Sequence, residues 1–251
     1  MKEETESQAR FFELGEGYFW LAGQNELVER VLAPYLTRLR SASGERPLRI
    51  LDIGCGPGNT LRRLRGWGQT FGMDYSLDAL AFARERGAAR VLSGDSTALP
   101  VASESVDCVV VLDNLEHVED DEKALREIRR VLRPGGVFLF TVPAFMALWR
   151  HHDVMYGHFR RYSKRDFAAR VRRAGLVIEE HRFFKCGYFL PLWALAKTER
   201  LLRRVVSPRD NFYRVPDWLN RLMRAEIVWE DQAGLTRVLP FGVSLICAGS
   251  R

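Results

Sequence analysis

Four aspartates recur at nearly regular intervals in the first half of the chain. Asp52, Asp74, Asp95 and Asp113 lie 22, 21 and 18 residues apart, and each ends an apolar run or stands in the turn after one. Such runs are typical of buried strands, and in open α/β sheets ligands bind outside the carboxyl ends of the strands. A carboxylate can accept hydrogen bonds from two ribose hydroxyls, whereas a ring of carboxylates repels pyrophosphate. The spacing therefore predicts a pocket for a cationic nucleoside, with Asp74 as the ribose ligand unless it only caps the helix that begins near Ser76.

A glycine-rich loop follows the first of these strands. Gly54, Gly56 and Gly58 alternate with other residues, and Cys55 stands between the first two. Glycine permits positive φ and has no Cβ, so a ligand can lie against bare main chain there. Short glycine runs also occur in ordinary turns, so the loop is informative only together with the acids. The dinucleotide fingerprint fits less well, because position 59 is Asn where that motif requires glycine.

Five short segments, taken in order, resemble the motifs of class I S-adenosylmethionine-dependent methyltransferases. They are residues 51–59, Asp74, residues 94–96, residues 114–118 and residues 132–137. The resemblance covers roughly residues 48 to 143. It implies that the glycine loop contacts the methionine portion of S-adenosylmethionine, that the acid after the second strand binds the ribose, and that later motifs meet the adenine and border the methyl donor. The cofactor contacts expected on this basis are Asp52, Gly54, Cys55, Gly56, Gly58, Asp74, Tyr75, Asp95, Ser96, Asp113 and Asn114.

Histidines and tyrosines gather in residues 149–163, directly beyond the fifth strand. The resemblance implies that this segment lines the acceptor pocket. A hydroxyl or carbon acid needs a base within hydrogen-bond reach, whereas a neutral amine does not, and histidine has the ordinary pKa nearest neutrality. The candidate bases are His117, His151 and His158. The same side chains could instead satisfy loop carbonyls and acids, and His117 could be a structural partner of Glu116.

The acceptor is expected to contact aromatic and basic residues near this segment and near the amino terminus. A metal site built from His151, His152, Asp153 and His158 is conceivable by residue type, but neighbouring histidines on an extended chain point in opposite directions. We therefore expect no metal ion. The predicted acceptor contacts are Tyr18, Trp20, His152, Tyr156, Arg161 and Tyr162.

The elements that must position these residues alternate between strand and helix. From residue 48 onward that alternation predicts an α/β fold with a doubly wound, mainly parallel, seven-stranded Rossmann-like sheet. The resemblance implies that the last strand, within residues 241–251, inserts antiparallel beside the fifth. Apolar spacing predicts a helix over residues 25–41, with Pro34 expected to kink or divide it. The cofactor-binding core is expected over residues 47–184.

Two segments lie outside that core. Residues 1–46 begin with an aromatic stretch that could plug the sheet edge or form a lid over cofactor or substrate. Residues 185–240 exceed what a hairpin between the last two strands needs, and they predict a helical insertion. Its apolar part is too short to span a membrane. A basic amphipathic helix could pack as a cap on the domain or lie on a membrane surface as a peripheral contact.

Composition limits the remaining function classes. The chain has 251 residues, a formal net charge of +6, and four cysteines without paired spacing, which is typical of a reduced, cytoplasmic protein. The basic residues fall on helical stretches without a nucleic-acid-binding motif, so nucleic acid is an unlikely substrate. We predict an enzyme that methylates an O, N or C atom of a small-molecule or lipid-like acceptor. The alternatives are an NAD(P)-dependent oxidoreductase and a non-catalytic S-adenosylmethionine-binding protein, and the sequence does not predict an oligomeric state.

Overall fold

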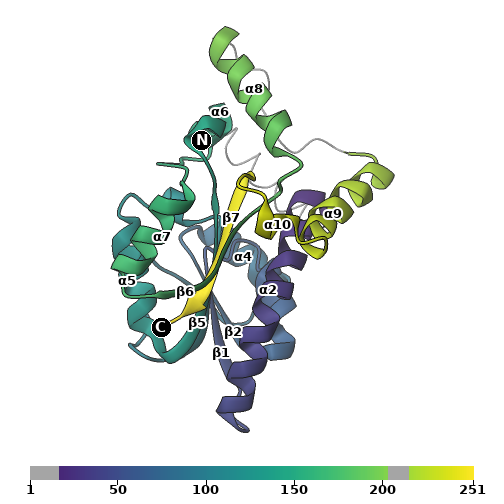
Figure 1. The fold of residues 1–251 in the computed structure, drawn as a ribbon. Helices are drawn as coiled ribbons and strands as arrows, with labels where there is room; N and C mark the ends of the chain where they lie inside the picture. The colour runs from purple at the N-terminus through teal and green to yellow at the C-terminus, as the bar shows by residue number, and fades with distance from the viewer. Residues whose placement is uncertain (1–16, 203–214) are drawn as a thin grey trace.

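The computed structural model describes residues 17–202 and 215–251. At its centre is a seven-stranded sheet in the order β3-β2-β1-β4-β5-β7-β6 (Figure 1). Strands β1 to β5 pair in parallel, and β7 lies antiparallel between β5 and β6. The predicted sheet and the predicted place of its last strand are confirmed. The strands are β1 (Leu48–Ile53), β2 (Gly68–Asp74), β3 (Val91–Ser93), β4 (Val106–Leu112), β5 (Leu132–Pro143), β6 (Val177–Phe184) and β7 (Ser244–Ser250).

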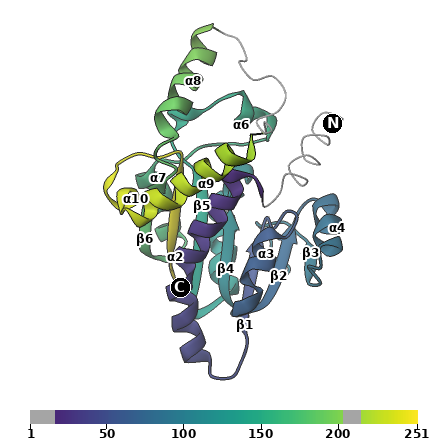
Figure 2. The same cartoon turned by 90° about the vertical axis from the view of Figure 1, so that its right-hand side faces the viewer.

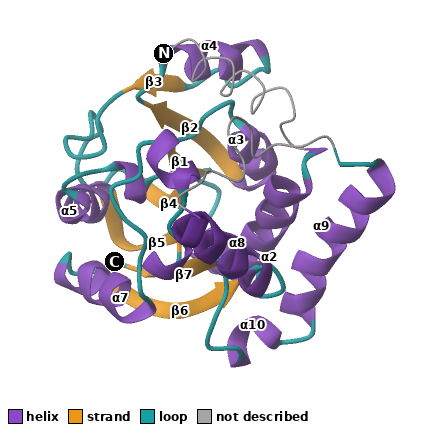
Figure 3. Ribbon diagram, turned by 90° about the horizontal axis from the view of Figure 1, so that it is seen from above, coloured by secondary structure: helices purple, strands orange, loops and turns teal. Residues whose placement is uncertain are grey.

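Helices cover both faces of the sheet (Figure 3). Helices α5 (Asp121–Val131) and α7 (Lys164–Arg173) pack on one face, and α2 (Phe19–Ser43) packs on the other. Helix α5 buries apolar residues at i, i+1, i+4 and i+7 in a stripe that faces the sheet, and apart from Asp121 its charged residues are at least partly exposed. The other elements before the insertion are α3 (Asn59–Leu64), η2 (Arg65–Trp67), α4 (Leu77–Glu85), η3 (Leu115–His117), η4 (Met146–Leu148) and α6 (His151–Met155).

The hydrophobic core forms two large clusters, one on each face of the sheet. In β4, Val109 and Val111 contribute to the cluster that contains α5 and α7, whereas Cys108 and Val110 contribute to the cluster that contains α2. Successive side chains of a strand point to opposite faces, so a strand buried on both sides is apolar throughout. The carboxyl ends of β1, β2, β4 and β5 therefore share one edge, where their loops meet.

Of the two effects expected of Pro34, division of the helix is wrong, because α2 runs unbroken from Phe19 to Ser43. Pro34 is exposed, while Val31, Leu32 and Tyr35 beside it are buried, and this packing holds the helix together despite the hydrogen bond that proline cannot donate. Helix α5 is followed directly by β5, which begins at Leu132 and pairs with β4 across an irregularity in register.

The segment between β6 and β7 forms three described helices: α8 (Phe189–Leu202), α9 (Asp217–Gln232) and α10 (Leu235–Val238). Helix α9 packs along α2 as a cap on the domain (Figure 2). Helix α8 extends beyond the carboxyl ends of the strands, near α6 (Figure 1). Within the described ranges, no helix has the length and apolar character that crossing a membrane requires. The aromatic stretch before residue 17 lies outside the described residues.

Candidate active site

The loop after β1 presents open main chain at the carboxyl edge of the sheet. Gly54 and Gly56 have φ of 73° and 49°, conformations that residues with a Cβ adopt at a cost. A Cβ at Gly54 would collide with the side chain of Asn114, whereas a Cβ at Gly56 would meet nothing within 4 Å. The loop is fixed on its inner side, because the amides of Gly54 and Cys55 donate to the carbonyl of Met73 at 2.7 and 3.0 Å. Its outer side can therefore receive a ligand.

Two carboxylates flank this loop. Asp74 accepts hydrogen bonds from the Gly56 amide through Oδ2 (2.8 Å) and from the Ser76 amide through Oδ1 (2.9 Å). Ser76 itself caps α4. Asp52 is 1% exposed, and its Oδ2 has no hydrogen-bond partner within the described part of the chain. Burial, with a smaller contribution from Asp74, raises the pKa of Asp52 to about 8. A buried, unpaired carboxyl group of this kind is stabilised when a positive charge lies beside it.

The other expected adenine and ribose contacts lie farther along the same edge. Tyr75 is 88% exposed, just after β2. Asp95 and Ser96 follow β3, and Asp95 accepts hydrogen bonds from the amide and hydroxyl of Thr97 at 2.7 and 2.9 Å. Those bonds hold the pKa of Asp95 below its usual range. Much of the hydrogen-bonding capacity of Asp95 is therefore used within its own turn.

A buried polar chain supports the turn after β4. Asp113, at φ 46°, accepts hydrogen bonds from Gln24 Nε2 (2.8 Å) and from the Thr141 hydroxyl (3.0 Å). Gln24 Oε1 in turn accepts from Nζ of Lys185 at 2.5 Å, and that ammonium group lies 3.8 Å from the centre of the Trp20 ring. Residues from α2, β4, β5 and the end of β6 thus meet behind the turn.

Lys185 is fully buried, and burial lowers its pKa to about 7. Its main-chain amide and that of Cys186 donate to the carboxylate of Glu230, whose pKa burial raises to about 7. Sequence reasoning missed Gln24, Lys185 and Glu230. The only signal was a lysine directly after an apolar strand end.

The candidate bases separate into two groups. His117, in η3, and His158 have ring centres 4.6 Å apart, whereas His151 lies apart from them at the start of α6. His158 Nδ1 lies 2.9 Å from Asp153 Oδ1, and Asp153 also binds Arg161 Nε and Nη2 at 2.7 and 3.1 Å. The structure therefore brings the exposed His117 next to His158, which is held by the buried Asp153.

Burial sets the ionisation of this group. It lowers the pKa of His152 to about 4, and it raises the pKa of the Glu116 carboxyl group well above its usual range. The pKa of Asp153 falls to about 2 because hydrogen bonds from His158 and Arg161 outweigh its burial. At neutral pH, Asp153 is the charged anchor of this region.

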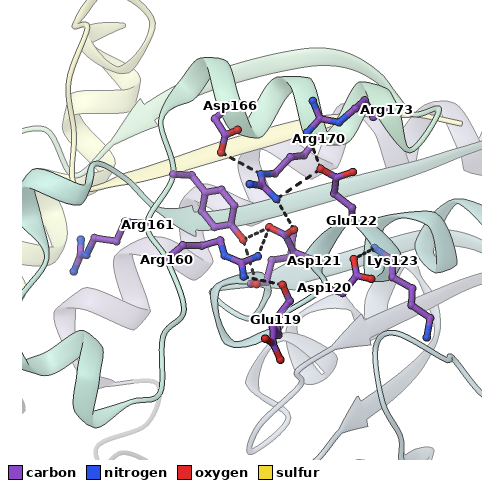
Figure 4. Close-up of polar contacts among 12 residues, drawn as sticks. Glu119, Asp120, Asp121, Glu122, Lys123, Arg160, Arg161, Asp166, Arg170 and Arg173 are labelled. Carbon is purple, nitrogen blue, oxygen red and sulfur yellow. Dashed lines mark hydrogen bonds and ion pairs between the residues drawn. The ribbon is translucent and has the colours of Figure 1, made fainter.

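Among the expected acceptor contacts, Tyr162 is a correction. Its side chain is fully buried, and its hydroxyl donates to Asp121 Oδ2 at 2.7 Å. Arg160 and Arg170 bind the same carboxylate at 3.0 and 2.7 Å, so the acid at the start of α5 fastens both α7 and the preceding loop (Figure 4). Tyr162 therefore supports the loop from inside and cannot line a pocket.

The remaining expected contacts have defined neighbours. Arg161 is occupied by Asp153. The His152 and Tyr156 rings lie 4.5 Å apart in and just after α6. Tyr18 is the residue directly before α2, and the Trp20 ring packs edge-on against the Tyr188 ring, with their centres 5.6 Å apart. The described start of the chain thus packs on the insertion, where the side chain of Asn220 also binds the Phe19 amide at 2.8 Å.

Residues 51–140 match the family model described as a methyltransferase domain. This part of the chain, which runs from β1 into β5, is therefore similar to methyltransferase domains. A malonyl-[acyl-carrier protein] O-methyltransferase of Enterobacter lignolyticus is 34% identical over 57% of this chain and 58% of the relative. A demethylmenaquinone methyltransferase of Renibacterium salmoninarum is 35% identical over 39% of this chain and 43% of the relative. The chain spans about half the length of these curated relatives.

The fold of the methyltransferase domain extends over most of the described chain. A Haloferax volcanii methyltransferase, solved in complex with the Trm112 activator, aligns with a TM-score of 0.55 over 91% of this chain and 93% of its own, at 22% identity. Identity at that level shows the fold alone. The residues of this edge fit S-adenosylmethionine, since the open main chain at Gly56 and the oxygen of Asp52 that lacks a partner among the described residues lie beside Asp74.

A separate cavity of about 350 Å³ lies away from this edge. Its walls come from α2, β6, α9 and α10, and none of its lining residues belongs to the loops after β1, β2 or β4. Arg38 and Glu179 form an exposed ion pair there at 3.3 Å. Residues 51–140, which match the methyltransferase-domain model, contain the glycine loop and Asp52 and none of the residues that line this cavity.

Proposed function

We propose that this protein transfers the methyl group of S-adenosylmethionine to an O, N or C atom of a small-molecule or lipid-like acceptor. The observation that carries the proposal is the buried Asp52 carboxylate, whose Oδ2 lacks a partner among the described residues, beside the open main chain of Gly56. A ligand with a positive charge would pair with the Asp52 carboxylate, and its polar groups could bind the open main chain at Gly56. The match of residues 51–140 to the methyltransferase domain supports the same ligand.

The residues of the pocket would divide the work of binding. Asp74 would accept both ribose hydroxyls, while its existing bonds to Gly56 and Ser76 hold the carboxylate in place. Asp52 would face the charged methionine portion, and Asp113 with Asn114 would border the transferred methyl group. When bound, S-adenosylmethionine supplies a methyl group on a positively charged sulfur that leaves readily. The protein then needs mainly to align the acceptor and exclude water.

His117 and His158 lie on the turn after β4 and on the loop beyond β5, which border the expected methyl position. We expect His117→Ala or His158→Ala to lower turnover at least about 100-fold, the usual effect of removing a group that activates the acceptor. His151→Ala is the matched control and should stay within about twofold of the parent. Steady-state rates on the true acceptor measure this, with S-adenosylhomocysteine affinity confirming that each variant is folded. Equal rates in all three variants would exclude the His117 and His158 pair.

The lipid-like character of the acceptor is supported by helix α8. Leu190, Trp193, Leu201 and Leu202 of α8 are exposed, although α8 is fixed at its polar face by the Arg150–Glu199 ion pair at 2.7 Å. Apolar residues held above the acceptor loop suit a substrate with a hydrocarbon portion. The relative named for demethylmenaquinone, a lipid-like quinone, agrees with that chemistry.

We expect the full chain to co-sediment with anionic lipid vesicles, and Leu201→Glu with Leu202→Glu to reduce the bound fraction at least about fivefold, because each change removes apolar area from the bilayer boundary and adds repulsion. Val238→Glu replaces an equally exposed apolar residue on α10 and is the control. An equal loss in the control, or no binding by the parent protein, would contradict a lipid-facing α8.

The direct test of function is production of S-adenosylhomocysteine, followed by mass spectrometry, from a panel that includes malonyl-acyl carrier protein and demethylated quinones. Turnover with any member, together with a mass gain of one methyl group, supports the proposal. Tight binding of S-adenosylhomocysteine without turnover across the panel would favour a non-catalytic binding protein.

A further inference from the structure

Three potential metal ligands meet beside the expected methyl position. One ligand atom from each of Glu116, His117 and His158 lies within 4.8 Å of the other two. Glu116 and His117 belong to η3 after β4, and His158 comes from the loop after α6. The two segments are tied together, because the Phe159 amide donates to the Glu116 carbonyl at 2.8 Å. The cluster is therefore built by tertiary structure from residues about 40 positions apart.

Glu116 is the observation that points to a ligand. Its side chain is 1% exposed, and its Oε2 has no hydrogen-bond partner within the described residues. The nearby guanidinium of Arg161 is already committed to both carboxylate oxygens of Asp153. A buried carboxylate without a compensating charge or donor is costly, so buried acids are generally paired or coordinate metal ions. A cation beside Oε2 would supply the partner that the described side chains do not, and it would stabilise the ionised form of Glu116.

The histidines are oriented as metal ligands usually are. Asp153 Oδ1 lies 2.9 Å from His158 Nδ1, which leaves Nε2 clear of that contact. A carboxylate behind a histidine fixes the ring and increases its strength as a ligand. Asp153 is in turn held by Arg161 and by the main-chain amide of Arg150 at 2.8 Å, so it cannot itself turn toward the cluster. His117 packs edge-on against His158 and completes the set.

We propose that Glu116, His117 and His158 bind one divalent transition-metal ion. Two imidazoles and one carboxylate suit ions such as Zn²⁺ or Fe²⁺, whereas Mg²⁺ and Ca²⁺ prefer oxygen ligands throughout. Donors at about 2.0 to 2.2 Å from one ion lie at most about 4.4 Å apart, so small side-chain rotations close the site. Three protein ligands leave coordination positions open, as in catalytic metal sites.

The place of this site suggests its use. Glu116 is two residues beyond Asn114, whose side chain packs over Gly54 in the glycine loop. An ion there would bind an oxygen atom of the acceptor and hold it toward the methyl donor. This role rests on the proposed function, whereas the binding of the ion by the three side chains is independent of it. The set shares only His158 with the one that residue type suggested, because Asp153 is occupied by Arg161 and His151 lies outside the cluster.

Titration of the chelator-treated full chain with Co²⁺, followed by its visible absorption and by calorimetry, tests the inference. We expect one ion per chain, and at least about 100-fold weaker binding in Glu116→Gln and in His158→Ala. His151→Ala, a histidine in the same segment outside the cluster, should bind Co²⁺ like the parent. The affinity of every variant for S-adenosylhomocysteine should stay within about threefold, which shows that the fold is intact.

Failure of the parent protein to bind Co²⁺, or equal binding by all variants, would overturn the metal site. If S-adenosylhomocysteine still bound and the chelated protein still turned over, the methyltransferase proposal would stand without it. Co²⁺ binding that depends on Glu116 and His158, in a protein that does not bind S-adenosylhomocysteine, would support the metal site and count against the proposed function instead.

Discussion

Asp74→Ala should lower the affinity for S-adenosylhomocysteine at least about 100-fold. The ribose would lose two charge-assisted hydrogen bonds to the Asp74 carboxylate, each worth roughly 1.5 to 3 kcal/mol. Because a tenfold change in affinity corresponds to about 1.4 kcal/mol, the loss of both bonds amounts to a factor of about 100 or more. The substitution would also release the amide of Gly56, which Asp74 holds at 2.8 Å. Both effects weaken the same pocket, so the loss should appear in the binding enthalpy measured by calorimetry.

Asp78→Ala is the matched control for this measurement. Asp78 is an exposed acid in the first turn of α4, four residues farther along the chain. Its removal changes the net charge by the same amount and should leave the affinity within about twofold. Undiminished affinity in Asp74→Ala would remove the ribose assignment. An equal loss in both variants would show that general electrostatics, and not Asp74, controls binding.

The second large effect concerns the buried Lys185, and it depends on pH. The pKa of Lys185 is lowered to about 7 in the folded chain, whereas the lysine of an unfolded chain keeps its proton to about pH 10.5. Between these values the unfolded chain binds more protons at this residue, so its contribution to folding stability rises with pH. Relative to Lys185→Met, the parent should gain about 1.4 kcal/mol per pH unit, or roughly 4 kcal/mol between pH 7 and pH 10.

Denaturant unfolding of both proteins at several pH values measures this difference, and the groups common to both proteins cancel in it. Lys197→Met, which removes an exposed lysine from α8, should show no such pH-dependent difference. A constant difference between the parent and Lys185→Met from pH 7 to pH 10 would mean that Lys185 keeps its charge when buried. The interaction with Trp20 and Gln24 would then be the whole of its role.

The sheet could be predicted because the same local pattern, an apolar run followed by an acid, recurs several times along the chain. Apolar runs ending in acids mark the carboxyl ends of β1, β2 and β4, and parallel strands bring such ends to one edge. The glycine loop was predictable for the same reason, since it directly follows β1. Asp52 and Asp74 accordingly lie where their spacing places them, beside the glycine loop at the carboxyl edge of the sheet, while their roles in binding stay predictions.

What the sequence could not give are contacts between distant segments. Lys185 and Gln24 are 161 positions apart, and no local pattern marks either residue as a partner of Asp113. Tyr162 looked like a pocket residue because aromatic rings cluster around it, yet its hydroxyl finds Asp121 and its ring enters the core. The pairing of Glu116 with His158 likewise depends on how the loop after α6 folds back on η3.

A crystal structure of the protein with S-adenosylhomocysteine would show directly where the nucleoside binds. We expect the nucleoside at the carboxyl edge of β1 and β2, with both ribose hydroxyls on Asp74, the amino acid portion over Gly56, and its ammonium group near Oδ2 of Asp52. A nucleoside bound elsewhere, or that edge filled by a phosphate-bearing dinucleotide in competition, would contradict this expectation.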